Sequence, residues 1–382
     1  MPRRHAAPSP PPRARRLRRP SSASAPAAPA HAAPRHVGVV GAGIAGITAA
    51  RALAQAGWRV TVFEKSRGAG GRMATRRTPF GGFDHGAQFF TVRDARFRLA
   101  LDATGAPVAP WDASLVRVLD DLGHHIVAAP LTRETHWVAT PGMSALVKAW
   151  AEPLADSPSG RCHWESRVVR LEPDAIAPAH WQIRVEGPDD TPAVHSGFDA
   201  VLLAIPAPQA LELLRTSGLA ADWQARLAHE VVMAPCWTLM AAWPQAMQPG
   251  LDGLGPRWHA ARSENHRIAW VAREPSKPGR DPGERWVVQA SPAWSAEHLE
   301  DDPDRITAKL LKGFAEITGI HASPSHAVVH RWRYAQTQRP LGEPCLWDAR
   351  RGLGLCGDWC LGHRVESAFL SGLELALTVL ES

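Results

Sequence analysis

The sequence lacks the features of several specialised protein classes. Its five cysteines are scattered and odd in number, none forms a C-x-x-C pair, and no His/Cys cluster has zinc-site spacing. No run of apolar residues is long enough to cross a membrane. These absences argue against a disulfide scaffold, a metal centre and a membrane anchor, and they favour a reducing, cytoplasmic compartment. The cysteines are Cys162, Cys236, Cys345, Cys356 and Cys360.

Acidic residues and lysine are missing from the first 35 residues, which contain eight arginines. The whole chain of 382 residues has 43 basic and 37 acidic side chains, a formal net charge of +6. Removing those eight arginines leaves 35 basic side chains against 37 acidic ones, a net charge of −2. The remainder is close to neutral, so the basic isoelectric point is no argument for nucleic-acid binding.

The same 35 residues are rich in proline, alanine and serine, and they cannot bury enough apolar surface to offset the entropy of ordering. Their composition predicts a disordered tail. Arginine and serine are also typical of transit peptides, but the apolar stretch of a secretory signal is missing. A real tail, a targeting segment and a mis-assigned start codon are all open interpretations.

The order of elements changes after the tail to that of a βαβ unit. Residues 37–40 read as a short buried strand, and a glycine-rich turn at 41–46 follows it. The pattern then predicts a helix over 47–56 and a second strand over 59–63, which stops at Glu64. A strand, a helix and a parallel strand in this order form a right-handed crossover.

The turn has the G-x-G-x-x-G spacing of a dinucleotide-binding site. In such a turn Gly41 allows a tight bend, Gly43 lets backbone amides approach a pyrophosphate, and Gly46 lets the helix pack closely on the strand. The helix N-terminus adds the positive end of its dipole. Glu64 lies where a carboxylate accepts hydrogen bonds from the adenosine ribose. The sequence therefore predicts a dinucleotide cofactor.

Later segments indicate a second sheet, a helix after Asp302 and a closing helix over 366–380. Residues 237–243, 267–271 and 285–290 read as strands outside the nucleotide fold. Asp302 and Pro303 fit the N-cap and N1 positions of a helix with an apolar face. That face is formed by Ile306, Leu310, Phe314 and Ile317.

Two adjacent glycines, Gly70 and Gly71, precede Arg72 shortly after Glu64. Here the sequence resembles the flavin amine oxidase and phytoene desaturase superfamily, in which a G-G-R motif contacts the flavin diphosphate. Exposed backbone amides and a delocalised cation suit a phosphate oxygen. Further motifs narrow the resemblance to the renalase family, particularly its bacterial members, from about Val37 to the C-terminus. These motifs are Phe83–Thr91, Thr140–Met143, His330–Gln336, Gly357–Cys360 and Val365–Gly372.

The resemblance implies noncovalent FAD, with contacts from Ala45, Arg72, Gln88 and Phe89. It also implies a role for Asp358 near the ribityl or phosphate groups, and for the next helix start beside flavin N1/O2. The residues predicted to contact FAD are Gly41, Gly43, Ile44, Ala45, Gly46, Glu64, Lys65, Gly71, Arg72, Met73, Gln88, Phe89, Val168, Gly357, Asp358, Val365, Glu366 and Ala368.

The resemblance implies that Trp332 borders a substrate pocket over the flavin. Trp332 and Tyr334, the chain's single tyrosine, share one face of a strand with His330. The implied substrate is an isomer of NAD(P)H reduced at a carbon other than C4, which gives hydride to flavin N5. Oxygen then accepts the electrons, yielding NAD(P)⁺ and hydrogen peroxide. No catalytic residue and no metal ligand is assigned, and the expected partners are a small-molecule substrate and O2, with no nucleic acid or membrane.

Two other functions stay open. A flavin amine oxidase or dehydrogenase would need an aromatic cage around its amine, often built with tyrosines. A flavin-binding sensor or partner module without turnover is the rival from another class.

The fold class expected is α/β, with a Rossmann-type FAD domain of the glutathione reductase or p-hydroxybenzoate hydroxylase kind and a second α+β substrate domain with a mixed sheet. The FAD domain is predicted to be discontinuous, comprising 36–90, 136–205 and 326–382. Residues 91–135 and 206–325 are expected to form the substrate domain.

Overall fold

The computed structural model describes residues 35–112, 116–126, 134–247, 256 and 258–382. The segment predicted to be a disordered tail lies, apart from Arg35, outside these residues. Within the described ranges, no helix is long and apolar enough to span a bilayer.

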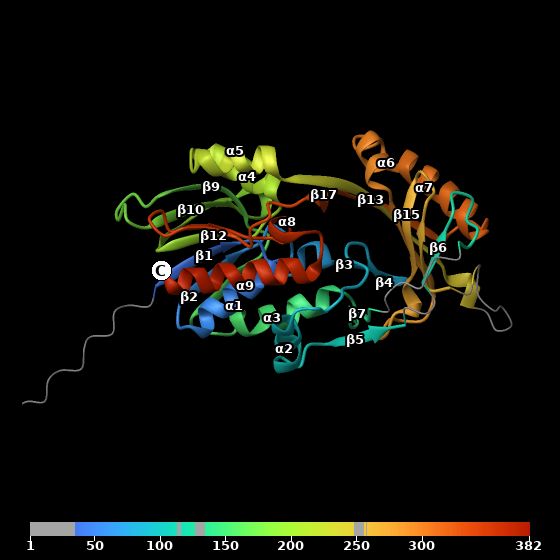
Figure 1. The fold of residues 1–382 in the computed structure, drawn as a ribbon, viewed down its shortest axis with the longest axis horizontal. Helices are drawn as coiled ribbons and strands as arrows, with labels where there is room; N and C mark the ends of the chain where they lie inside the picture. Colours follow the sequence, from blue (N-terminus) through green and yellow to red (C-terminus); the bar gives the residue numbers. More distant parts are fainter. Residues whose placement is uncertain (1–34, 113–115, 127–133, 248–255, 257) are drawn as a thin grey trace, which may run out of the picture. The chain divides into compact units, whose positions relative to one another are not determined.

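The first sheet is built around the predicted βαβ unit (Figure 1). The central strand β1 pairs in parallel with β2 on one side and with β12 on the other. The outer strands β8 and β19 are also parallel, whereas the edge strand β18 is antiparallel. In spatial order the strands are β18 (Leu346–Asp348), β19 (Leu353–Leu355), β12 (Ala200–Leu203), β1 (His36–Val40), β2 (Arg59–Phe63) and β8 (Gly160–His163).

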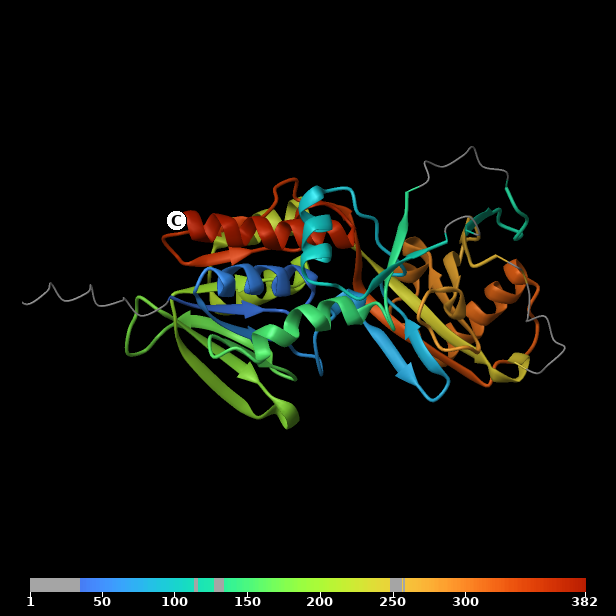
Figure 2. The same ribbon diagram turned by 90° about the horizontal axis from the view of Figure 1, so that it is seen from below.

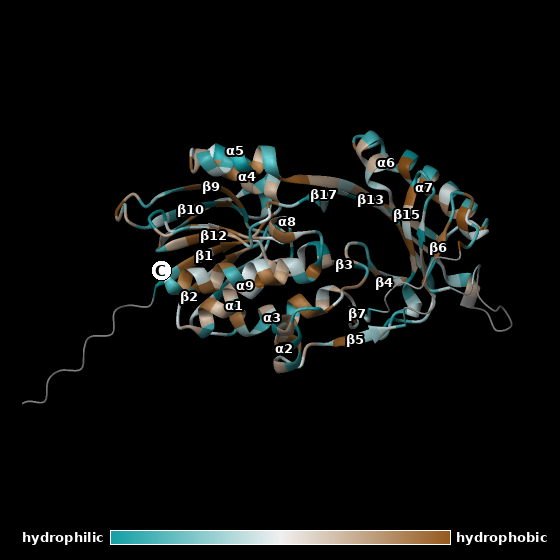
Figure 3. Cartoon of the chain, in the orientation of Figure 1, coloured by the Kyte–Doolittle hydropathy of each residue, from teal (hydrophilic) through white to brown (hydrophobic). Residues whose placement is uncertain are grey.

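Alternate residues of these strands enter two separate cores, because successive side chains point to opposite faces. On one face, Val37 and Val39 pack with the helices α1 (Ile44–Gln55), α2 (Ala95–Ala103), α3 (Ser144–Ala155) and α9 (Val365–Glu381). On the other, Val40 packs with the helices α4 (Ala207–Ser217) and α5 (Ala221–Glu230) and an antiparallel sheet. That sheet contains β9 (Arg167–Pro173), β10 (Trp181–Glu186) and β11 (Pro192–Phe198). Figure 3 shows the hydrophobic colour of β1 and β12 between these layers.

The second six-stranded sheet is mixed, as expected for the substrate side. Its pairs are antiparallel except β14 with β6, which is parallel. In order it contains β17 (His326–Arg339), β13 (Val232–Trp243), β16 (Glu284–Ala290), β15 (Ile268–Arg273), β14 (Ala260–Ser263) and β6 (Val116–Leu119). The α/β fold with a mixed second sheet is therefore confirmed.

Helix α7 (Pro303–Thr318) covers this second sheet with the apolar face predicted from the sequence. The Asp302 carboxylate accepts hydrogen bonds from the amides of Asp304 and Arg305, which makes it the N-cap. The face packs on Trp243, Trp286 and Ile268. A shorter helix, α6 (Pro292–Glu297), precedes it.

Two hairpin-like pairs and short helical turns complete the described structure. They are β3 (Thr75–Thr78) with β4 (Gly81–Asp84), and β5 (Val108–Trp111) with β7 (His136–Ala139). Figure 2 shows β3 and β4 beside the long strands of the second sheet. The short turns are α8 (Asp358–Leu361) and the 3-10 turns η1 (Gly71–Met73), η3 (Pro188–Asp190), η4 (Pro244–Met247) and η5 (Glu274–Ser276).

Two elements begin earlier than the sequence pattern predicts. Helix α1 starts at Ile44 instead of Ile47, so the last part of the glycine-rich turn is already helical. Strand β13 starts at Val232 instead of Trp237, because its first half pairs with the long strand β17. The extension of β13 depends on pairing with a distant strand, which local periodicity does not encode.

Candidate functional site

A cavity of about 2220 Å³ lies where the parallel strands of the first sheet end. Residues following β1, β2 and β12 line it, among them Gly41, Glu64 and Ala204. In open α/β sheets, ligands bind at the carboxyl ends of the strands. The opposite wall comes from the second sheet, with Trp270 of β15 and Trp332 of β17. The cavity therefore joins the glycine-rich turn to the predicted substrate wall.

The glycine-rich turn offers the cavity an open helix N-terminus. Gly41 has φ +104°, and a side chain at Gly46 would collide with the Gly41 carbonyl oxygen. By contrast, no atom lies within 4 Å of a Cβ placed on Gly43, which lines the cavity. The first turn of α1 has no side-chain cap. Unpaired amides at a helix N-terminus with free space in front of them fit a pyrophosphate.

Glu64 is held at the end of β2 by two backbone amides. Its carboxylate oxygens accept hydrogen bonds from Ala42 N and Ser66 N, each at 2.8 Å. The residue is 7% exposed and lines the cavity. Each carboxylate oxygen has a further lone pair, so this geometry is compatible with a ribose hydroxyl.

Arg72 forms a paired contact with Asp358, two residues predicted to contact the cofactor. Its two guanidinium nitrogens donate to the two carboxylate oxygens, with Nη1–Oδ2 at 2.9 Å. The Thr337 hydroxyl donates to the same carboxylate at 2.9 Å. This fork joins η1 to α8 and to β17. The Arg72 guanidinium is thus bound to a carboxylate of the chain, which the sequence motif alone does not indicate.

The start of α9 also faces the cavity, with one exception. Val365 and Ala368 line it, and the helix N-terminus has no side-chain cap. Glu366 does not line it. The Glu366 carboxylate instead accepts hydrogen bonds from the amides of Arg93 (2.6 Å) and Asp94 (2.8 Å). Glu366 thus connects α9 to the loop before α2.

Gln88 and Phe89 stand side by side on the cavity wall but are held differently. The Gln88 amide donates to the carbonyls of Asp84 and Gly86 and accepts from Lys277 Nζ at 3.2 Å. Its polar atoms are thus engaged within the protein. The Phe89 ring stacks on His136 with centroids 3.9 Å apart.

A cluster of rings lies along β17 on the substrate wall. The Trp332 indole N–H donates to the His85 carbonyl oxygen at 2.8 Å, and the His85 ring stacks on Trp332. His330 contacts both rings edge-on. Burial, together with the nearby Arg76, lowers the pKa of His330 to about 4, and burial, His330 and Arg76 lower that of His85 to about 4. Both imidazoles are therefore neutral at pH 7.

The structure brings most of the predicted residues to one cavity, although contact with a cofactor stays a prediction for all of them. Gly46 is covered by the turn itself, and Glu366 is engaged elsewhere. Those lining the cavity are Gly41, Gly43, Ile44, Ala45, Glu64, Lys65, Gly71, Arg72, Met73, Gln88, Phe89, Val168, Trp332, Tyr334, Gly357, Asp358, Val365 and Ala368.

Sequence reasoning missed a buried ion network beside Gln88, formed by Asp84, Glu274, Lys277 and Arg280. All four side chains are at most 1% exposed. Lys277 Nζ lies 2.8 Å from Glu274 and 3.3 Å from Asp84, and Arg280 Nη2 lies 2.6 Å from Asp84. Burial alone would raise the pKa of Asp84, but Lys277 and Arg280 hold it below its usual value. Asp84 stands in the motif Phe83–Thr91, whereas its partners, about 190 positions later, lie in the 3-10 turn η5 and the loop after it, which have no periodicity.

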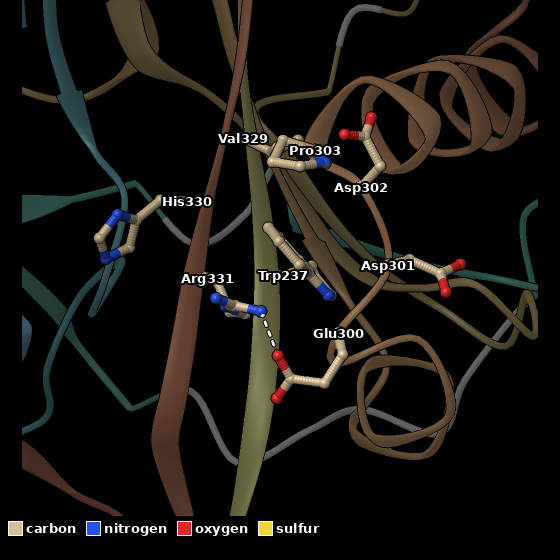
Figure 4. Close-up of a pocket in the computed structure, with 8 residues that line it drawn as sticks. All are labelled: Trp237, Glu300, Asp301, Asp302, Pro303, Val329, His330 and Arg331. Carbon is tan, nitrogen blue, oxygen red and sulfur yellow. Dashed lines mark hydrogen bonds and ion pairs between the residues drawn. The ribbon is translucent and has the colours of Figure 1, made fainter.

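A second, shallower hollow of about 720 Å³ lies on the far side of β17 (Figure 4). Three acidic residues line it, but each already has a partner. Glu300 pairs with Arg331 and Arg333. Asp301 pairs with His298, Arg305 and Lys309, and Asp302 caps α7. The acids of this hollow are therefore explained by local structure. Within the described ranges, no group of three or more His, Cys, Asp or Glu side chains could hold a metal ion.

Comparison with known proteins places this cavity in a flavoprotein context. The chain matches the family model of flavin-containing amine oxidoreductases over residues 117–380. Residues 39–101 match the model of an NAD(P)-binding Rossmann-like domain.

Two curated proteins are similar to parts of the chain. The L-amino-acid oxidase of Siganus canaliculatus is 34% identical over 105 residues, which is 27% of this chain and 19% of that protein. The putative L-amino-acid oxidase YobN of Bacillus subtilis (strain 168) is 51% identical over 45 residues, 12% of this chain and 9% of that protein. The matched segments therefore span less than a fifth of either relative.

Solved structures share the fold along almost the entire chain. A putative protoporphyrinogen oxidase from Exiguobacterium sp. 255-15 superposes with a TM-score of 0.69 at 14% identity, covering 92% of this chain and 100% of that one. A double mutant of putrescine oxidase gives a TM-score of 0.65 at 14% identity, covering 91% and 99%.

Proposed function

Because the chain belongs to the family of flavin-containing amine oxidoreductases, we propose that it is an oxidase with noncovalently bound FAD. Its substrate is a dihydronicotinamide dinucleotide reduced at a ring carbon other than C4, as the motifs similar to renalase imply. The dihydronicotinamide loses a hydride to become NAD(P)⁺, and O2 takes up both electrons and the proton of that hydride, together with one proton from solvent, to become H2O2. The amine oxidase reading is the second candidate.

Several features support a noncovalent FAD site. The uncapped α1 N-terminus, the free space at Gly43 and the carboxylate of Glu64 fit the two ends of an ADP group. Cys236 lines the cavity, but burial raises its pKa to about 11, so the thiol stays protonated and is a weak nucleophile. Acid precipitation of the yellow protein should therefore release free FAD. Colour that stays with the precipitate would refute noncovalent binding.

When bound, the flavin supplies a hydride acceptor at N5 and a route for electrons to O2. The residues of the chain have to position a flat ring and exclude water. Loss of hydride from a dihydropyridine leaves an aromatic cation, and no proton must be removed. A wall without a general base is sufficient for such a reaction. Burial lowers the pKa of His85 and of His330 to about 4, so both rings are weak bases, in agreement with this expectation.

The observation that carries the proposal is the extent of the cavity and the aromatic character of its substrate side. A pocket for one ligand usually measures about 300–1,000 Å³, whereas this one reaches about 2220 Å³. It has room for a dinucleotide cofactor and a second large ligand. Phe89, Trp270 and Trp332 provide flat apolar surface on that side.

We further propose that the first sheet and its helices hold the cofactor and that the second sheet forms the substrate side. The predicted boundaries at 205/206 and 325/326 stay predictions. Strand β17, which begins at the second boundary, pairs with β13 of the second sheet. The substrate part would then include 326–339.

The test is anaerobic mixing of the oxidised protein with candidate donors while the flavin absorbance is recorded. We expect fast bleaching by the C2 and C6 isomers and far slower bleaching by C4 NAD(P)H, because a small misplacement of the hydride is costly. Rapid bleaching by amines or L-amino acids, with none by any isomer, would instead establish the amine oxidase candidate. That candidate is favoured by the similarity to L-amino-acid oxidases, while the single tyrosine of the chain weighs against a tyrosine cage.

The variant Trp332→Ala sharpens this test. It should slow flavin reduction by the isomers by about tenfold, because it removes flat stacking surface from the substrate side. The FAD content should stay unchanged, since Trp332 lies away from the glycine-rich turn. Trp258→Ala is the matched control, because this half-buried tryptophan packs on Trp286 and does not line the cavity. Equal rates for Trp332→Ala and the unmodified protein would remove Trp332 from the substrate site.

A further inference from the structure

The hairpin β3–β4 places two arginines at the rim of the cavity. Arg76 and Arg77 are neighbours on β3, so their side chains leave opposite faces of the hairpin. Arg76 Nη2 lies 3.5 Å from His330 Nδ1 of β17, while Arg77 lowers the pKa of Lys148 on α3, where burial is the larger cause. Each face of the hairpin therefore carries one arginine. Of the two, Arg76 is the one beside the rings on β17.

Arg76 has no carboxylate partner among the described residues. Two other arginines of the cavity, Arg72 and Arg93, do have one, in Asp358 and Glu134. The groups around Arg76 are instead histidines, because its charge helps to lower the pKa of His85, His326 and His330 after the larger effect of burial. A guanidinium that lines a cavity without a counter-ion is ready to receive an anion from outside the protein.

Strand β17 fixes where such an anion would lie relative to the substrate wall. His326, Val328, His330, Trp332 and Tyr334 alternate along one face and all line the cavity. Figure 4 shows that His330 projects from the side of β17 opposite to Arg331. The ring centroids of His330 and Trp332 lie 4.4 Å apart. Along β17, His330 lies further than Trp332 from Thr337, whose hydroxyl contacts Asp358.

His330 can complete the site as a hydrogen-bond donor. If its Nδ1 accepts from Arg76, the proton of the neutral ring lies on Nε2. That N–H has no hydrogen-bond partner among the described residues. An arginine fork beside an imidazole N–H matches the oxygens of a phosphate group.

We propose that Arg76 and His330 form a subsite for the pyrophosphate of a dinucleotide whose nicotinamide ring lies against Trp332. This inference rests on the proposed function and names the part of the substrate that the rim binds. In such a dinucleotide, one ribose separates the ring from the first phosphate, which matches the order Trp332, His330, Arg76 along the wall. The same charge repels a protonated amine, so the subsite also selects between the two candidate substrate classes.

The experiment uses the full chain saturated with FAD, so that the ADP end of the cofactor site is filled. The probe is ADP-ribose, which carries the pyrophosphate but no nicotinamide, and binding is measured by titration calorimetry. We expect ADP-ribose to bind and Arg76→Ala to weaken it at least about tenfold, because a charge-assisted contact is lost. Arg76→Lys should restore part of the affinity.

Two controls make the result specific. Arg350→Ala removes an exposed arginine that does not line the cavity, and it should leave the affinity unchanged. Adenosine carries no phosphate, so its binding should not depend on Arg76. Equal affinity of Arg76→Ala and the unmodified protein for ADP-ribose would overturn the subsite.

The binding and bleaching experiments distinguish an error in the subsite from an error in the proposed function. If ADP-ribose does not bind while the isomers still bleach the flavin, the subsite is wrong and the function stands. If ADP-ribose binds through Arg76 while no isomer bleaches the flavin, the anion subsite stands and the proposed reaction is wrong.

Discussion

Two charged regions lie close to the turn at His85, and they differ in how their charges are compensated. In the buried ion network, Asp84 and Glu274 face Lys277 and Arg280, and every side chain is at most 1% exposed. At the cavity rim, the side chains that Arg76 meets among the described residues are neutral histidines. Cations that are paired and dry hold the fold together, whereas an unpaired cation on a cavity is available to a ligand.

The largest effect should come from removing a cation of the buried network. Lys277→Met leaves Glu274 and Asp84 with one buried cation fewer, and breaking a buried pair costs about 3–5 kcal/mol. The free energy of unfolding in urea measures this loss. The double variant Lys277→Met with Glu274→Gln should recover part of it, because one uncompensated carboxylate is removed as well.

Lys148→Met is the matched control, since Lys148 is a lysine of the cavity rim without an ion pair to a described residue. Burial and Arg77 lower its pKa, so loss of its charge should change the free energy of unfolding by less than about 0.5 kcal/mol. Equal losses in the two lysine variants would contradict the distinction between the two regions.

A smaller effect is expected at the paired arginine of the cavity. Arg72→Ala removes the fork to Asp358 and the link between η1, α8 and β17. We expect FAD affinity to fall about tenfold, measured as flavin absorbance per protein during dialysis. Arg98→Ala, which removes an exposed arginine paired with Asp102, serves as the control. Full FAD occupancy in a well-folded Arg72→Ala protein would mean that this pair does not support the cofactor site.

The rim should also show a dependence of stability on pH. The pKa of His330 and of His85 is about 4 in the folded protein, against 6.5 when unfolded. Between these values the unfolded chain binds more protons, so the free energy of unfolding should fall as the pH drops from about 6.5 to about 4. Arg76 and Asp84 are the charged groups nearest to these rings.

The check is urea unfolding at several pH values for the unmodified protein and for His330→Phe. The variant lacks one of the histidine rings whose pKa is lowered to about 4, so its stability should depend less steeply on pH in this window. His124→Phe removes an exposed histidine and should keep the original slope. A slope that does not change in His330→Phe would show that the ring is not buried as a neutral group.

The Rossmann-type fold could be predicted because its signals are local. The strand before Gly41 and the helix after it are contained within a short stretch of chain, and so are the cap and the apolar face of α7 on the second sheet. The length of β13 could not, since its first half pairs with the distant strand β17. For the site, the motifs located the cavity wall, but Glu366 faces the loop before α2 and not the cavity.

The sequence by itself determined which motifs and functional side chains the chain carries. They are a glycine-rich turn, a G-G-R motif, and a strand on which His330, Trp332 and Tyr334 occupy every second position. Only the tertiary structure decided which charges are compensated. Lys277 meets Asp84 across 193 positions, and Arg72 meets Asp358 across 286. Arg76, four positions after Arg72, meets no acid among the described residues. Periodicity records which face of an element is apolar, whereas an ion pair between loops depends on how distant segments pack.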